Sequence, residues 1–269
     1  MFFPIGFQRS GTTLLNYLLN EHPAIVSYSE WELVYWIHTG NERLLIDPQA
    51  DSYVKILRDH PIDSEAYSLL AWAYIKGELS IVDFVRRSYM LGVRETTQVV
   101  GNKEAISLTH CQYGVMKKFA KDFRTLGPVI FIERDPRAVT ASFIKLGFYP
   151  PDKAPLNEAN LKQFVIDYVN CMNASEKYIR RFRRILPIRY EDLLSNPVDV
   201  LQRIFSFLEV DDSRELAHSI CTTSGQRSRM NFTGIAPERA MSWEKRLSTS
   251  EAGWIMDYYG SHRKTKLFS

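Results

Sequence analysis

GFQRSGTT, residues 6–13, joins a short apolar run to a leucine-rich segment in this chain of 269 residues. The apolar run over residues 2–6 predicts a buried strand. Residues 12–20, with leucines at positions 14, 15, 18 and 19, predict a helix with one buried face. A glycine-rich turn between a strand and a helix directs backbone N–H groups and the helix N-terminus at one point, where proteins often hold a phosphate. The stretch therefore predicts an α/β fold with an anion site at its first strand–helix connection.

The spacing of this turn matches the nucleoside triphosphatase pattern G-x-x-x-x-G-K-[ST] at every position except the lysine, which is Thr12 here. In those enzymes the lysine reaches the β and γ phosphates. The cation of this turn is instead Arg9, inside the loop. We therefore expect the loop to hold something shorter than a triphosphate, through Arg9, Thr12, Thr13 and the loop amides.

Strand-like and helix-like segments alternate along the chain, which indicates a central, mostly parallel sheet flanked by helices. Further strands are expected at residues 25–29, 97–101, 129–132 and 185–190. A long helix is predicted at about 158–183, and residues 223–247 read as a loop. No composition shift marks a domain boundary, so we expect one domain over residues 1–269, with a helical insertion at about 31–96.

The composition limits the classes of partner. With 34 Lys and Arg against 31 Asp and Glu, the chain carries a net charge of +3, and the charges are mixed along it. This pattern argues against nucleic-acid binding. No apolar run approaches the roughly 18 residues that span a bilayer, and the first residues lack the basic segment of a signal peptide. We expect a cytoplasmic protein without a membrane span, although a cut-down protein of the secretory pathway remains open.

The cysteines and the possible metal ligands give no special signal. Cys111, Cys171 and Cys221 lack CxxC spacing, and their odd number predicts three buried thiols rather than a disulfide framework. No set of His, Cys and carboxylate residues has the spacing of a metal site, so no metal is predicted.

A second phosphate site is indicated by VIFIERDPRAVTAS, residues 129–142, which reads as a strand, a polar turn and a helix. Arg134 follows the strand at its carboxyl end, where open α/β sheets bind ligands. Ser142 lies about two turns into the helix. A guanidinium can bind a phosphate through two hydrogen bonds, and a serine hydroxyl can donate another. The alternative is that Arg134 pairs with Asp135 or Glu133.

These segments, in this order, resemble the sulfotransferases that use 3′-phosphoadenosine 5′-phosphosulfate (PAPS). RSGTT, at 9–13, resembles the family's 5′-phosphosulfate loop, and RDPR with the later serine, at 134–142, resembles its 3′-phosphate site. RYEDL, at 189–193, resembles a third family segment. The resemblance implies a P-loop NTPase-like sulfotransferase fold, PAPS as sulfonyl donor and the bisphosphate PAP as product. The nucleotide-binding residues that it implies are Arg9, Ser10, Gly11, Thr12, Thr13, Arg134, Ser142 and Tyr190.

The segment from Arg9 to Glu30 is similar to tyrosylprotein sulfotransferases and their bacterial relatives, in which RSGTTLL is followed by His-Pro and then a catalytic Glu. The resemblance implies that Glu30 is the general base for the acceptor hydroxyl, with Arg9 also in the catalytic group. Glu30 directly follows the strand predicted at 25–29, so it is expected at the same sheet edge as the phosphate loop.

Lys103 lies in a segment, GNKE at 101–104, that resembles the N-K-D-P segment of the same branch, with Glu-Ala in place of Asp-Pro. The resemblance implies that this lysine stabilises the oxygen of the leaving phosphate. In the cytosolic branch a catalytic histidine lies two residues later, where this chain has Ala105. His110 is interpreted as a helix-start residue.

The acceptor is not defined by the sequence beyond carrying a hydroxyl group. Carbohydrate, lipid, peptide tyrosine and small-molecule acceptors all remain open, as does a homo-oligomer. The aromatic residues of the insertion are expected mainly in a helical core. Two other functions are considered: a P-loop kinase using ATP, which Thr12 disfavours, and a non-catalytic nucleotide-binding module, which only an assay separates. The basic residues of the late loop are left without a role.

Overall fold

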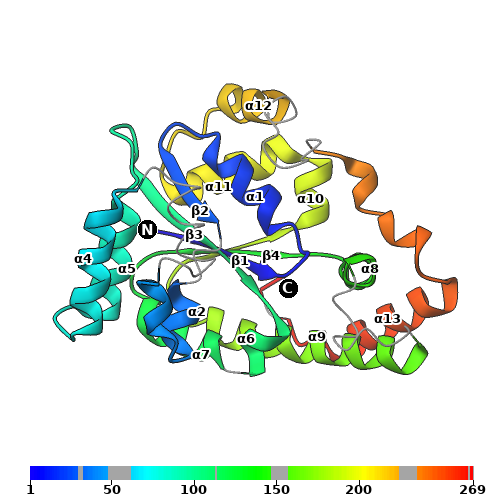
Figure 1. Cartoon of the computed structure of the whole chain (residues 1–269). Coiled ribbons are helices and arrows are strands. Elements are labelled where there is room, and N and C mark those ends of the chain that lie inside the picture. Colours follow the sequence, from blue (N-terminus) through cyan, green and yellow to red (C-terminus); the bar gives the residue numbers. More distant parts are fainter. Residues whose placement is uncertain are drawn as a thin grey trace.

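The computed structural model describes residues 1–29, 33–47, 62–112, 114–146, 157–223, 235–265 and 267–268. At its centre lies a five-stranded parallel sheet with the order β2-β3-β1-β4-β5 (Figure 1). The strands are β1 (Phe3–Phe7), β2 (Ile25–Ser29), β3 (Val99–Ile106), β4 (Val129–Glu133) and β5 (Ile185–Arg189). The α/β architecture expected from the alternating segments is confirmed.

Helices cover both faces of the sheet. One face carries α1 (Thr12–Asn20), α10 (Tyr190–Ser195), α11 (Pro197–Leu208) and α12 (Arg214–Thr223) (Figure 1). The other side of the sheet carries α2 (Leu33–His38), α4 (Ser64–Ile75), α5 (Ile81–Met90), α6 (Leu108–Gln112), α7 (Val115–Phe123), α8 (Pro136–Leu146), α9 (Glu158–Ile179) and α13 (Thr249–His262). Short 3-10 helices span Glu42–Leu45, Pro237–Arg239 and Ser242–Lys245.

The strands divide the apolar core into two parts because alternate side chains point to opposite faces of a sheet. In β4, Ile130 and Ile132 pack with the leucines of α1, whereas Phe131 packs with the core under α7 and α9. The strand is buried on both faces, as is usual for a parallel sheet. This leaves the ends of the strands as the place where polar side chains can gather.

Strand β3 differs from the prediction for this region. It spans Val99–Ile106, not 97–101, so Lys103 lies inside a strand rather than after one. The polar run Asn102-Lys103-Glu104 interrupts the apolar pattern by which buried strands are recognised, although Asn102 and Lys103 are both buried. Smaller differences concern α9, which ends at Ile179, and the late loop, whose described residues form two short 3-10 helices.

The prediction of three free thiols is wrong for two of them. Cys111 on α6 and Cys171 on α9 form a disulfide, with their Cα atoms 5.6 Å apart. Their spacing in the sequence held no sign of the packing of α6 against α9, which brings them together. Cys221 remains a thiol, and burial raises its pKa to about 11.

None of the helices in the described part of the chain has both the length and the apolar character needed to cross a bilayer.

A buried ion network ties the carboxyl-terminal helix to β4. Arg263, just after α13, donates through Nε to Glu133 at 2.9 Å and through a terminal nitrogen to Glu176 at 2.7 Å. All three side chains are at most 3% exposed. Burial alone disfavours a charged guanidinium, but the contact with Glu133 raises the pKa of Arg263 above its ordinary value. The network thus anchors the residue that directly precedes Arg134.

Replacing the buried cation should destabilise the fold strongly. In Arg263→Met, Glu133 and Glu176 lose their cation while remaining buried, which costs about 3–5 kcal/mol of unfolding free energy. Urea unfolding measures this loss. The control Arg214→Met breaks an exposed pair with Asp199 and should cost less than about 1 kcal/mol. Equal midpoints and slopes for the two variants would contradict a stabilising role of the network.

Candidate functional site

The glycine-rich loop directly follows β1 at the carboxyl edge of the sheet. The Gln8 amide donates to the carbonyl of Ile106 at 2.8 Å, so the loop begins beside the end of β3. Arg9 and Gly11 both have left-handed backbones, with φ of 69° and 92°. Such a conformation is uncommon for arginine, and backbone strain of this kind tends to occur at functional sites.

Gly11 is required by its surroundings as well as by its backbone. A Cβ atom at this position would lie 2.1 Å from the ring of Tyr190, which packs directly on the loop. Gly11 also precedes α1. The first turn of this helix has no acidic residue, and no side chain at the N-cap position accepts a hydrogen bond from its amides. The amides at this helix start are therefore directed toward the space where an anion can bind.

The structure brings the two predicted phosphate segments together. Arg9 donates through Nε to the hydroxyl of Ser142 on α8 at 2.9 Å, although 133 residues separate them. Arg134 donates to the backbone carbonyl of Arg9 at 3.0 Å. The loop after β1 and the connection after β4 thus form one continuous polar site.

Arg134 is a half-buried cation that forms no ion pair with an acid among the described residues. Its guanidinium donates to the carbonyls of Arg9 and Arg239 and lies 4.4 Å above the centre of the Tyr190 ring. Its Nε is buried and has no hydrogen-bond partner in the described part of the chain. Burial lowers the pKa of Arg134 from its ordinary value. A half-buried guanidinium whose hydrogen bonds go to neutral carbonyls favours an anionic ligand, because a charge is better stabilised by an opposite charge.

The acids on either side of Arg134 are engaged elsewhere. Glu133 accepts from Arg263, and Asp135 forms an ion pair with Arg137 at 2.6 Å. The Arg137 guanidinium also lies 4.1 Å above the ring of Trp243. The alternative that Arg134 pairs with Glu133 or Asp135 is therefore not what the structure shows.

The remaining loop residues, Ser10, Thr12 and Thr13, lie at the start of α1, where the helix was predicted to begin. Ser10 is fully buried, and its hydroxyl has no hydrogen-bond partner in the described residues. Thr12 is buried against the sheet and Thr13 is exposed. The unpartnered Ser10 hydroxyl and the exposed Thr13 hydroxyl can both donate to a ligand at this helix start.

Lys103 is almost completely buried, with 1% of its surface exposed. Alternation along β3 places it on the same face as Gly101, and a Cβ at Gly101 would meet the ring of Phe2, which packs with α1. Lys103 therefore faces the α1 side of the sheet. Its register partner in β2 is Ser29, the residue that precedes Glu30 in the chain. Glu30 itself lies outside the described residues, so its role stays a prediction.

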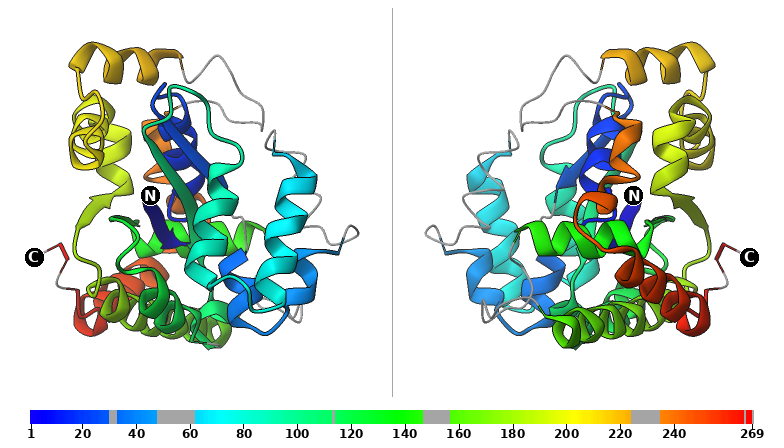
Figure 2. Two further views of the ribbon diagram at one scale, coloured as in Figure 1. Left: turned by 90° about the vertical axis from the view of Figure 1, so that its left-hand side faces the viewer. Right: turned by 90° about the vertical axis from the view of Figure 1, so that its right-hand side faces the viewer.

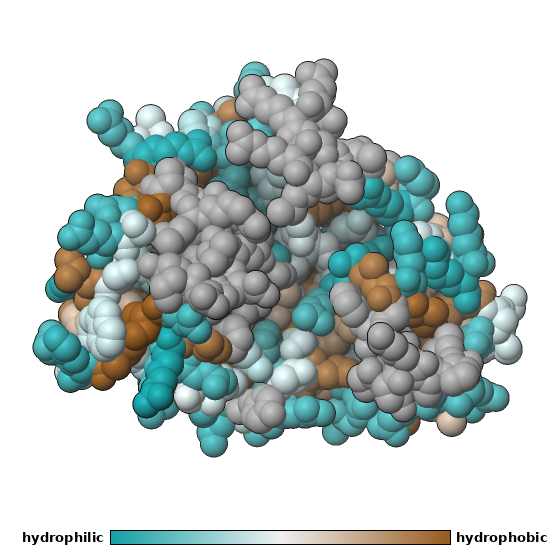
Figure 3. All heavy atoms as spheres, viewed as in Figure 1, coloured by the Kyte–Doolittle hydropathy of each residue, from teal (hydrophilic) through white to brown (hydrophobic). Residues whose placement is uncertain are grey.

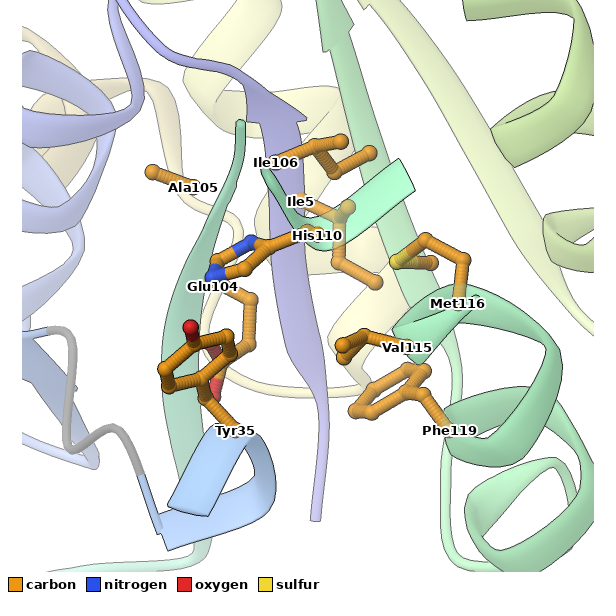
Figure 4. Close-up of a pocket in the computed structure, with 9 residues that line it drawn as sticks. All are labelled: Ile5, Tyr35, Glu104, Ala105, Ile106, His110, Val115, Met116 and Phe119. Carbon is orange, nitrogen blue, oxygen red and sulfur yellow. The ribbon is translucent and has the colours of Figure 1, made fainter. Parts of the chain in front are cut away.

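A small pocket that the sequence did not indicate lies on the other face of the same edge (Figure 4). Tyr35, Glu104 and His110 form its polar part, and the Tyr35 and His110 rings are 4.8 Å apart. Its apolar part consists of Ile5, Ala105, Ile106, Val115, Met116 and Phe119. His110, interpreted as a helix-start residue, does accept from the Ser107 amide at 3.3 Å, but its ring also borders this pocket. The only sequence signal was its position just after a strand.

A parallel sheet with a glycine-rich loop between its first strand and helix is the arrangement of P-loop folds. The profile of the sulfotransferase domain family matches residues 2–233. The chain belongs to the sulfotransferase family, and the fold expected from the resemblance is confirmed.

Solved structures agree with this fold. The sulfotransferase domain from the curacin biosynthetic pathway is 19% identical, with a TM-score of 0.69 and 97% of each chain covered. The sulfotransferase domain from the Synechococcus PCC 7002 olefin synthase is 19% identical, with a TM-score of 0.60 and coverage of 97% of this chain and 94% of that one. Mouse sulfotransferase SULT7A1, complexed with PAP, is 14% identical, with a TM-score of 0.55 and coverage of 99% and 85%. No curated protein matches the sequence.

A side chain at position 11 should disrupt this site. Gly11→Ala forces alanine into a left-handed backbone, at roughly 1–2 kcal/mol, and its Cβ displaces Tyr190 from the loop. We expect a clearly lower thermal unfolding temperature. The matched control is Gly253→Ala in α13, where nothing lies within 4 Å of the added Cβ. That variant should be unchanged or more stable by up to about 1 kcal/mol, and a similar loss in both would argue against the packing of Tyr190 on Gly11.

Proposed function

We propose that the protein transfers the sulfonyl group of PAPS to a hydroxyl-bearing acceptor. The observation that supports this most strongly is the half-buried guanidinium of Arg134, which contacts Arg9, the partner of Ser142, and forms no ion pair among the described residues. Two phosphate-binding segments in contact suit a donor that carries phosphate at both ends of its ribose. A nucleoside triphosphate has its phosphates in one row and would lack the lysine replaced by Thr12.

Each segment has a proposed part in binding the donor. Arg9, Ser10, Thr12, Thr13 and the amides around Gly11 would hold the 5′-phosphosulfate. Arg134 and Ser142 would hold the 3′-phosphate, with charge-assisted hydrogen bonds from the guanidinium. Tyr190 packs on both Gly11 and Arg134 and would border the nucleotide.

The proposed reaction is an in-line displacement at sulfur. The acceptor oxygen attacks the sulfur while Glu30 takes the hydroxyl proton, and the bond between sulfur and the bridging phosphate oxygen breaks. Lys103 and Arg9 would offset the negative charge that develops on that oxygen as PAP leaves. Lys103 and the end of β2 lie side by side in the sheet, which supports a joint action with Glu30.

The pocket beside His110 and Tyr35 is our candidate for the acceptor side. It borders the end of β3, and Glu104, which follows Lys103 in the chain, is one of its lining residues. The pocket has a volume of only about 10 Å³, the room of one water molecule, so it would border the acceptor rather than enclose it.

Calorimetric titration with PAP, and with ATP and magnesium in parallel, tests the donor. We expect PAP to bind much more tightly than ATP. A preference for ATP would instead favour the kinase, and binding of neither ligand would leave the donor proposal without support. PAP binding without turnover on any acceptor would favour the non-catalytic module.

Arg134→Ala should weaken PAP binding by roughly 10- to 100-fold, the cost of one or two charge-assisted hydrogen bonds. Adenosine 5′-phosphate, which lacks the 3′-phosphate, serves as the control ligand, and its affinity should change little. Calorimetry of both ligands on both proteins measures the difference. An equal loss for the two ligands would show that Arg134 supports the fold of the loop rather than the 3′-phosphate.

Glu30→Gln should lower turnover by roughly 10²- to 10⁴-fold, because the amide cannot accept the acceptor proton. The affinity for PAP should stay near that of the wild type. Glu32→Gln is the matched control in the same segment and should keep most of the activity. The measurement is the rate of PAP release from PAPS with an acceptor found by screening, and wild-type turnover in Glu30→Gln would rule out the base assignment.

A further inference from the structure

Helix α4 carries large apolar side chains on its outer side. Leu69 is 67% exposed and Trp72 is 48% exposed, whereas Tyr67 and Ala71 on the inner side are fully buried. The helix lies at the edge of the molecule beside α5, away from α12 and α13 (Figures 1 and 2). Apolar side chains interrupt the hydrophilic surface at this edge in the space-filling view (Figure 3). Exposed apolar residues gathered in one place mark an interaction surface.

Two charges continue this apolar pair along the helix. Glu65 lies four residues before Leu69, and Lys76 lies four residues after Trp72. Both are exposed. At about 100° of rotation per residue, these four side chains fall in one narrow stripe along the outer side. The stripe reads acid, apolar, apolar, base, and its spacing is symmetric about its own midpoint between Leu70 and Ala71.

We infer that this stripe, hereafter the α4 stripe, binds the same stripe of a second copy of the chain with the two helices antiparallel. In that arrangement Glu65 lies opposite Lys76 of the second copy, and Leu69 lies opposite Trp72 of the second copy. Each contact occurs twice, as a two-fold axis requires. A parallel arrangement would place Glu65 against Glu65 and Lys76 against Lys76, so the charges select the antiparallel one.

Apolar surface beside the stripe extends this contact. A groove between α4 and α5 is lined on the α4 side by Ala66, Leu69, Leu70 and Ala73 and on the α5 side by Arg86, Arg87 and Met90, which is 50% exposed. The contact can therefore spread beyond one pair of helices, as a stable interface needs. Because α8, which carries Ser142, lies on the opposite side of the molecule from α4, pairing leaves that part of the site uncovered (Figure 1).

Sedimentation equilibrium over a wide range of protein concentration tests the inference. The wild type should dimerise, and Trp72→Ser should be monomeric, with circular dichroism confirming that it is folded. A wild type that stays monomeric at all concentrations would overturn the inference. So would binding of the monomer, through Trp72, to vesicles of zwitterionic and anionic phospholipid, because the occupant of the stripe would then be a lipid surface.

Charge exchange tests the antiparallel geometry. Glu65→Lys and Lys76→Glu should each weaken the dimer by at least tenfold, since each places two pairs of like charges in contact. The double variant Glu65→Lys/Lys76→Glu should restore wild-type dimerisation, because every opposite pair is rebuilt. Glu215→Lys is the matched control, a second-position glutamate on α12, and should change nothing. A dimer whose affinity is unchanged by both single exchanges would overturn the inference. So would a double variant that dimerises as weakly as the single variants.

Discussion

The guanidinium of Arg134 is the point at which the candidate site is held together. It joins the loop after β1, the connection after β4 and the segment around Arg239 through two carbonyl groups, and it stacks on the ring of Tyr190. Its neighbours in the chain, Glu133 and Asp135, are bound by Arg263 and Arg137. The two acids next to Arg134 in the chain therefore form their ion pairs with other arginines.

This arrangement leaves a partly desolvated cation beside the loop. Carbonyl dipoles and an aromatic ring offset only part of the cost of burying a cation. Burial also raises the pKa of Tyr190, although nearby Arg134 acts in the opposite direction, so the tyrosine stays neutral and cannot supply the missing charge. A bound phosphate can supply it, and a ligand that binds only the folded state stabilises that state. In the proposed function, phosphate binding and stability are therefore linked at Arg134.

Features of the fold and the site that form within a few consecutive residues could be predicted from the sequence. The loop at 6–13 and the unit at 129–142 each combine strand, turn and helix within a few residues, so their place at the sheet edge was predictable. Lys103 was predicted to follow a strand, because the polar residues beside it in the sequence do not resemble a buried strand. The strand is buried nevertheless, since β1 and β2 pair with it on both sides. The Cys111–Cys171 disulfide and the contact of Tyr35 with His110 depend on packing between distant elements, for which one sequence carries no signal.

The segment predicted as a helical insertion also shows where prediction from one sequence ends. Its aromatic residues were expected mainly in a core, and Tyr67 is fully buried as expected, whereas Trp72, five residues later, is half exposed. Helical periodicity separates the two, since five residues correspond to well over a full turn and place them on opposite sides of α4. The packing of α4 on α5 accounts for the buried inner face but gives no role to the exposed Leu69 and Trp72. The inferred pairing gives them a role, because the order of charges along the α4 stripe makes the outer face complementary to itself.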